Sequence, residues 1–155
     1  MKYAIIIPAG SGKTTLSRKY KQLYDIDAFH NKEDEEALNN LYREVVISND
    51  WEKYNKYEIS LIKDKIEKLS SPFVILLHSK EKADLLDLKY LGSIKICKEI
   101  MEKVAKQRGL SSQLREEQTI NSWNNCEGKI FESFEDIEKC VIKICNYNNI
   151  ILNKN

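Results

Sequence analysis

The chain has 155 residues, of which 42% are hydrophobic and 32% are charged, and its formal net charge is +1. These values are typical of a globular chain with a sizeable core, so we expect residues 1–155 to form a single domain. A net charge so close to zero excludes a whole-protein field that attracts nucleic acid or a membrane surface, although it leaves room for a local basic patch.

The first predicted element is a strand from Tyr3 to Ile7, because an uninterrupted apolar run suits a strand covered on both faces of a parallel sheet. A helix is expected from Thr14 to Leu23, where apolar residues recur at helical spacing. Between them, residues 8–15 read PAGSGKTT. Glycines let such a loop turn its N–H groups inward, and the start of the helix adds unpaired N–H groups and a positive dipole end. This arrangement predicts a phosphate-binding loop.

The loop matches the Walker A pattern G-x-x-x-x-G-K-[ST], except that Ile7 stands at the position of the first glycine. Lys13 is predicted to be an exposed cation that contacts the terminal phosphates, and the Thr14 hydroxyl is predicted to bind Mg²⁺. A tight turn that binds no ligand is the alternative. The residues predicted to bind the nucleotide are Ala9, Gly10, Ser11, Gly12, Lys13, Thr14 and Thr15.

A short second strand is predicted near residues 25–29, and ligands of parallel sheets bind at the carboxyl ends of the strands. Asp25 and Asp27 point different ways if the chain is extended there, so only one of them would face the site. We predict that Asp27 orients or deprotonates a phosphate acceptor and that Asp25 helps to hold Mg²⁺. A helix cap or a solvated loop remains equally open for both residues.

One or two helices are predicted over residues 34–69, then a strongly apolar strand at 73–77 and a short helix at 80–88. His78 follows that strand, where many nucleotide hydrolases carry an acid that helps to hold Mg²⁺. The missing acid argues against a strong hydrolase. His78 could contact an acceptor or a phosphate, or could only cap the strand.

The remaining elements are a strand at 92–97, a helix from Glu99 to Arg108, a strand at 129–131 and a helix at 135–147. Residues 109–128 are polar, and we expect them to be loop-like and mobile. Arg108 and Arg115 are predicted catalytic cations, because phosphoryl transfer spreads negative charge over the moving group. A solvated charged surface is the alternative for both arginines.

Residues 5–15, the Tyr-Asp-Ile-Asp sequence at 24–27, and the strand and basic helix at 92–109 together resemble the small P-loop kinases. That family includes nucleoside monophosphate kinases, shikimate kinase, dephospho-coenzyme A kinase and the kinase domains of polynucleotide kinases. The resemblance covers most of the chain, but only the phosphate loop is specific. It implies a three-layer α/β fold with a five-stranded parallel sheet in the order 2-3-1-4-5, and ATP and Mg²⁺ as cofactors.

The resemblance also implies an acceptor-binding region at about residues 34–69 and a basic lid at about residues 106–125. Family lids usually carry arginines where this chain has Lys103 and Lys106. In the acceptor region, the plausible contacts are Arg43, Asp50, Trp51 and Tyr54.

The expected activity is transfer of the γ-phosphate of ATP to a nucleoside, a nucleotide or a polynucleotide end. Two alternatives remain open. A helicase-like motor fragment shares the phosphate loop but needs an Asp-Glu motif and a second domain. A non-catalytic nucleotide-binding module is compatible with Ile7 and with the missing strand-end acid. The sequence identifies neither the acceptor nor the oligomeric state.

The cellular setting is predicted from features that the chain lacks. Residues 1–7 have neither the length nor the cleavage region of a signal peptide, and no apolar run approaches the ~20 residues that span a bilayer. The four cysteines form no Cys-x-x-Cys pair. We therefore expect a cytoplasmic protein with no membrane partner and no zinc.

Overall fold

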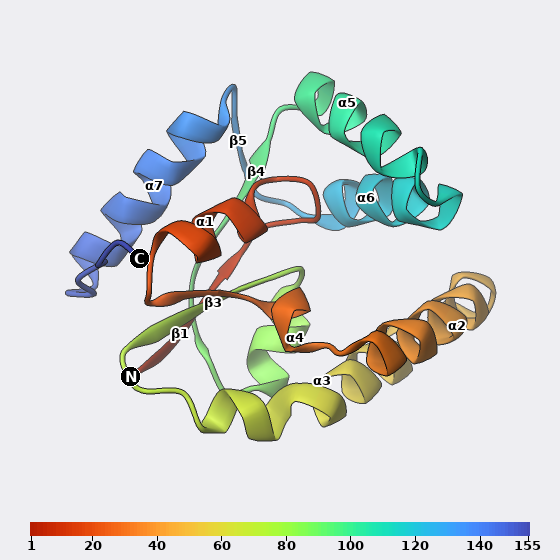
Figure 1. The fold of residues 1–155 in the computed structure, drawn as a ribbon, viewed down its shortest axis with the longest axis horizontal. Coiled ribbons are helices and arrows are strands. Elements are labelled where there is room, and N and C mark those ends of the chain that lie inside the picture. Colours follow the sequence, from red (N-terminus) through yellow and green to blue (C-terminus); the bar gives the residue numbers. More distant parts are fainter.

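The computed structural model describes residues 1–155 and contains a five-stranded sheet in the order β2-β3-β1-β4-β5 (Figure 1). All four neighbouring pairs are parallel. Both the strand order and the parallel pairing agree with the prediction. The strands are β1 (Lys2–Ile6), β2 (Leu23–Asp25), β3 (Phe73–Leu77), β4 (Lys89–Ile96) and β5 (Lys129–Phe131). The helices are α1 (Lys13–Lys19), α2 (Lys32–Ser48), α3 (Trp51–Glu67), α4 (Lys80–Leu85), α5 (Lys98–Gly109), α6 (Gln113–Asn125) and α7 (Phe134–Tyr147), with a 3₁₀ helix, η1, at Ile26–Phe29.

Helices cover both faces of the sheet, as the apolar strands require. Alternate residues of a strand point to opposite faces, so Ile5 and Ile7 belong to one buried cluster while Ala4 and Ile6 belong to the other. The first cluster is completed by α1, α5, α6 and α7, and the second by α3 and α4 (Figure 1). This explains why β1 and β3 are almost continuously apolar. None of the helices is both long and apolar enough to cross a membrane.

The second strand is shorter and earlier than predicted. It ends at Asp25, and residues 26–29 form η1 instead of continuing as a strand. The cause is local, because the Asp25 side chain accepts a hydrogen bond from the Asp27 N–H and caps η1. The two aspartates therefore do not alternate across a strand, and both can face the same end of the sheet.

The expectation of a loop over residues 109–128 is wrong, because residues 113–125 form α6. Its polar sequence gives little helical periodicity, and its stability comes from tertiary contacts. Thr119 and Trp123, four residues apart, are its buried side chains. The Trp123 indole N–H donates to the Ile96 carbonyl at 2.7 Å, which attaches the end of α6 to β4.

Lys95 completes this attachment from inside the protein. Its Nζ donates to the carbonyls of Trp123 and Cys126, at 3.1 and 2.7 Å, and lies 3.7 Å from the centre of the Trp123 ring. These carbonyls lie at the carboxyl end of α6, where a helix leaves acceptors unpaired. A cation placed there satisfies them and is itself held by the aromatic ring.

We expect Lys95→Met to lower the free energy of unfolding by about 1–3 kcal/mol, because two buried carbonyls lose their donor. Urea unfolding followed by tryptophan fluorescence measures this loss. Lys98→Met is the matched control, since the Lys98 side chain is 69% exposed and its replacement should change stability by less than about 0.5 kcal/mol. Equal stability of the two variants would contradict this role for Lys95.

Candidate functional site

The loop between β1 and α1 has the shape that its glycines predict. Gly10 and Gly12 have φ angles of 81° and 102°, in the left-handed region that favours glycine. A Cβ atom on Gly10 would also lie 3.0 Å from Thr119 Cγ2 and 3.2 Å from Val104 Cγ1. Side chains at these two positions would therefore strain the loop or displace its neighbours.

Three neighbouring elements hold the loop in place. The Ile96 N–H of β4 donates to Ser11 Oγ at 3.3 Å, and the Ala9 N–H donates to Ser122 Oγ of α6 at 2.9 Å. Ile7, at the position where Walker A has its first glycine, donates its N–H to the Leu77 carbonyl at 2.9 Å and is fully buried. The departure from the pattern thus lies in the core beneath the loop, outside the turn formed by residues 10–14.

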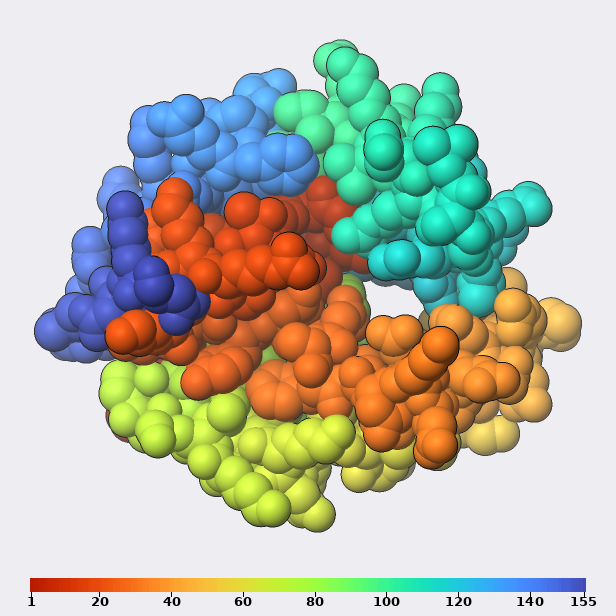
Figure 2. All heavy atoms as spheres, in the orientation of Figure 1, coloured from red at the N-terminus to blue at the C-terminus, as the bar shows by residue number.

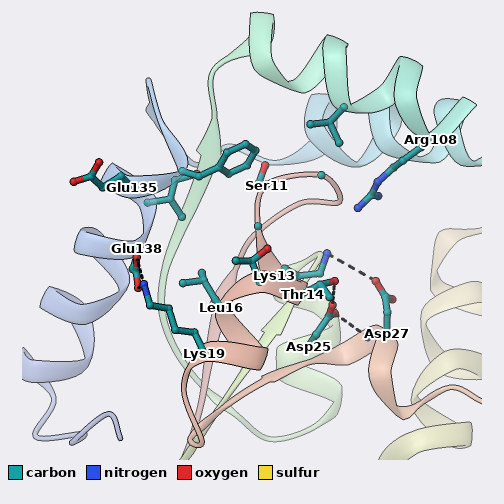
Figure 3. Close-up of a pocket in the computed structure, with 16 residues that line it drawn as sticks. Ser11, Lys13, Thr14, Leu16, Lys19, Asp25, Asp27, Arg108, Glu135 and Glu138 are labelled. Carbon is teal, nitrogen blue, oxygen red and sulfur yellow. Dashed lines mark hydrogen bonds and ion pairs between the residues drawn. The ribbon is translucent and has the colours of Figure 1, made fainter. Parts of the chain in front are cut away.

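The loop forms one wall of a pocket of about 500 Å³, within the usual range for small-ligand sites (Figure 3). One end holds Lys13, Asp25, Asp27 and Arg108, and the other lies between α1 and α7. The pocket contains the predicted residues from Gly10 to Thr15, but neither Ala9 nor Arg115 lines it. The remaining lining residues are Leu16, Lys19, Val104, Phe134, Glu135, Ile137 and Glu138.

Two carboxylates meet the loop at the charged end. Lys13 Nζ lies 3.8 Å from Asp27 Oδ2. Thr14 Oγ1 donates to Asp25 Oδ2 at 2.9 Å, and Asp25 is buried. Lys13 is only 5% exposed, so the expectation of an exposed lysine is wrong. The Thr14 hydroxyl and the Asp25 carboxylate are oxygen donors of the type that Mg²⁺ prefers, so this pair fits a Mg²⁺ ion.

Arg108 reaches the charged end from α5 (Figure 3). Its guanidinium donates to Thr119 Oγ1 at 3.3 Å, and the Thr119 hydroxyl donates to the Arg115 carbonyl at 2.7 Å. Burial and the nearby charge of Arg115 both lower the pKa of Arg108. The two predicted arginines are therefore close enough to repel, although the Arg115 side chain is exposed outside the pocket. An anion between them would relieve this repulsion.

A buried ion network that sequence reasoning missed lies behind Asp27. His78 Nε2 is 3.4 Å from Asp27 Oδ2, and Lys82 Nζ is 3.2 Å from His78 Nδ1. Lys82 Nζ also forms an ion pair with Glu58 at 2.6 Å, and His30 Nε2 lies 3.2 Å from the other Glu58 oxygen. The only local sequence signal is the four-residue spacing of His78 and Lys82, since Glu58 lies on a different helix.

This network is better suited to its own lysine than to a metal ion. Ligand atoms of Asp27, Glu58 and His78 lie within 4.8 Å of one another, a spacing compatible with metal binding. However, the Lys82 ammonium already contacts Glu58 and His78. A divalent cation would have to displace Lys82 and would meet the charge of Lys13 nearby, so we place no metal there.

Charges around Asp27 determine its protonation. Partial desolvation acts to raise the pKa of Asp27, but attraction to His78, Lys13 and Lys82 holds it well below its usual range. The lowered pKa keeps the Asp27 carboxylate ionised near neutral pH, and its side chain is 49% exposed, so a ligand can reach it. For Glu58, burial likewise acts to raise the pKa, but Lys82 and His30 lower it to about 2.

The pKa values of the two histidines are shifted in opposite directions from the usual value of 6.5. Desolvation opposes protonation of His30, but Glu58 raises its pKa, whereas burial and Lys13 lower the pKa of His78. The contribution of His30 to the free energy of unfolding is therefore fully present below pH 6.5, and it is lost as the pH rises through the pKa of His30 in the folded protein. The pH dependence from His78 has the opposite sign. Its contribution to the free energy of unfolding is fully present above pH 6.5 and decreases as the pH drops below that value.

NMR titration of the two imidazole rings between pH 4.5 and 9 measures this difference, with assignment from His30→Asn. The wild-type advantage in unfolding free energy over His30→Asn should be greater at pH 6 than at pH 8.5. A His78 pKa above that of His30 would contradict the described network.

The expected acceptor region forms the α2–α3 hairpin. Tyr42, Trp51 and Tyr54 pack edge to face, with ring centres 5.7–6.3 Å apart. Of the other two predicted contacts, Arg43 donates to Asn40 on the exposed side of α2, and Asp50 caps α3. Neither of these two lies with the aromatic cluster.

Helix α6 is joined to α2 by two side-chain hydrogen bonds. Gln118 donates to Asn39 at 3.2 Å, and Asn121 donates to the Tyr42 hydroxyl at 2.7 Å. Figure 2 shows an opening between the orange α2 segment and the blue-green α6. Asp27 and Arg108 lie on the side of the pocket away from α7 (Figure 3).

Comparisons with known proteins do not add to this description: no protein-family model matches the chain, and no curated protein matches it.

Proposed function

We propose that the protein transfers the γ-phosphate of ATP to a hydroxyl group of a nucleoside, a nucleotide or a polynucleotide end. The main support is that Lys13 of the glycine loop and Asp27 lie beside each other at one end of the pocket. Lys13 Nζ is 3.8 Å from Asp27 Oδ2. A lysine for the terminal phosphates and a carboxylate for a hydroxyl proton are then neighbours, as direct transfer requires.

In this proposal the pocket is divided between the two ends of ATP. The loop N–H groups and Lys13 bind the phosphates, and the adenosine lies toward Phe134 and Ile137. Phe134 contributes an apolar ring close to Gly12, since a Cβ atom on Gly12 would lie 3.4 Å from it. The acceptor approaches through the opening between α2 and α6, opposite the adenosine.

The transfer step then follows from the residues at the charged end. The acceptor oxygen forms a bond to the γ-phosphorus, the bond to the oxygen shared with the β-phosphate breaks, and ADP leaves. Asp27 orients the acceptor hydroxyl and takes its proton, while Lys13 and Arg108 stabilise the negative charge on the transferring group. Thr14 and Asp25 would hold Mg²⁺, which supplies further charge neutralisation to the phosphates.

Radiolabelled ATP tests the proposal directly. The protein is incubated with [γ-³²P]ATP, Mg²⁺ and nucleosides, nucleotides or 5′-hydroxyl oligonucleotides, and thermal shifts are recorded for each ligand. Label on one acceptor, with slow phosphate release without it, is the expected result. Fast hydrolysis stimulated by long single strands, with no labelled acceptor, would favour a motor instead.

A non-catalytic nucleotide-binding module is the second candidate. It is supported by His78 at the end of β3, where a hydrolase would carry an acid that helps to hold Mg²⁺. A thermal shift with ATP, together with neither labelled acceptor nor phosphate release, is the result that would favour it.

Most of the predicted lid, residues 106–125, is the helix α6. The carboxyl end of α6 is anchored through Trp123, so we expect substrate to slow hydrogen exchange mainly over residues 109–118. Arg108→Ala should lower kcat by ~30- to 1,000-fold, because it removes a cation at the charged end of the pocket, and Arg115→Ala should have an effect of the same size if closure of the lid brings Arg115 to the transferring group. ATP affinity should change far less.

Hydrogen exchange with and without a bisubstrate analogue, together with steady-state kinetics, tests the lid. Lys98→Ala is the control, since that exposed lysine lies at the opposite end of α5. Unchanged exchange, combined with near-normal turnover of both arginine variants, would contradict it.

A further inference from the structure

A continuous chain of polar side chains leads from the core to Asp27. Glu58 on α3 contacts Lys82 on α4, Lys82 contacts His78 at the end of β3, and His78 faces Asp27. The side chains of Glu58, Lys82 and His78 are 2%, 7% and 19% exposed. Burying these groups is costly unless each finds a partner, so their arrangement is highly constrained.

The chemistry of each group sets the direction of the hydrogen bonds. A lysine ammonium only donates, so His78 Nδ1 must be the acceptor in its 3.2 Å contact with Lys82. A neutral imidazole that accepts at Nδ1 carries its proton on Nε2. Nε2 is the nitrogen that faces Asp27, at 3.4 Å from Oδ2.

The consequence for Asp27 is that one of its oxygens is engaged and the other is free. Oδ2 faces both His78 Nε2 and Lys13 Nζ, whereas no ion pair or hydrogen bond within the protein uses Oδ1. With Oδ2 held, the side chain has a defined rotation, and Oδ1 is left to accept a hydrogen bond from a ligand.

We propose that Glu58, Lys82 and His78 are positioning residues that fix the Nε2–H tautomer of His78 and thereby aim Asp27 Oδ1 at the acceptor hydroxyl. This inference rests on the proposed function, which it deepens by assigning a role to the histidine that replaces the strand-end acid. The competing explanation is that the network only packs α3 and η1 together, since Glu58 also contacts His30.

A spectroscopic test reports on the tautomer without any reaction. In wild-type protein labelled with ¹⁵N-histidine, two-bond ¹H–¹⁵N spectra should show the His78 proton on Nε2. Lys82→Met removes the donor to Nδ1, so both tautomers should appear. If that variant does not fold because Glu58 is left unpaired, Glu58→Gln/Lys82→Met removes both charges and serves in its place. A proton on Nδ1 in the wild type would overturn the inference.

Kinetics test the role in transfer. His78→Leu should lower kcat by about 10- to 100-fold with little change in KM for ATP, since the polar contact of His78 Nε2 with the charged Asp27 Oδ2 is lost. His78→Gln offers an amide N–H near the position of Nε2 and should restore most of kcat. Lys80→Met, at an exposed lysine that begins α4 two residues after His78, is the control and should match the wild type.

The outcomes separate this inference from the proposed function. If the wild type transfers phosphate but folded His78→Leu is as active as the wild type, or His78→Gln is no better than His78→Leu, the inference is overturned and the proposed function stands. If the wild type labels no acceptor, the proposed function itself is contradicted.

Discussion

Lys13→Ala is expected to reduce ATP-dependent transfer by on the order of 1,000-fold. The variant removes a full positive charge from the place where the terminal phosphates would bind, and a shielded site makes that charge more effective than it would be in water. Lys13 is nearly buried and lies in the loop beside Asp27.

The measurement is transfer from labelled ATP by purified protein, with melting temperature as the test of folding. Lys21→Ala is the matched control, because that lysine is exposed, follows α1 and does not line the pocket. We expect the control to retain wild-type activity and both variants to remain folded. Wild-type turnover in Lys13→Ala would rule out phosphate binding by this loop.

Asp27→Asn is expected to lower kcat by ~100- to 10,000-fold, because the amide cannot take a proton from the acceptor. The substitution keeps the shape of the side chain and its backbone position in η1. KM for ATP should change little, since the nucleotide is held by the loop and by the far end of the pocket. The loss should persist at saturating concentrations of acceptor and Mg²⁺.

Asp25→Asn distinguishes the role of Asp25 from that of Asp27. Its amide oxygen can still cap η1, but the negative charge beside Thr14 is gone. We expect a higher Mg²⁺ concentration for half-maximal activity and partial recovery when Mg²⁺ is raised. Asp84→Asn, at an exposed position on α4, should behave as wild type.

Full activity of Asp27→Asn would remove Asp27 from the transfer step.

The sequence by itself determined the glycine turn after β1 and the two central strands of the sheet. Residues 4–7 and 73–77 are apolar runs that only a doubly covered strand can bury, and glycines 10 and 12 occupy the positions that require positive φ. The predicted strand order is also the observed one. The strands and the glycine turn depend on local patterns, in which the residues that carry the signal are close together in the chain, whereas the expected strand order came from the resemblance to a known family.

Only the tertiary structure decided the features that depend on distant partners. Helix α6 is too polar to be predicted from periodicity, and it is held through Trp123 and Lys95, which belong to different elements. The burial of Lys13 follows from the way its loop packs against the neighbouring elements. Glu58 and Lys82 look like surface charges of amphipathic helices in the sequence. Packing of α3 against α4 buries them, and because a buried charge must find a partner, the same packing connects them to His78 and Asp27.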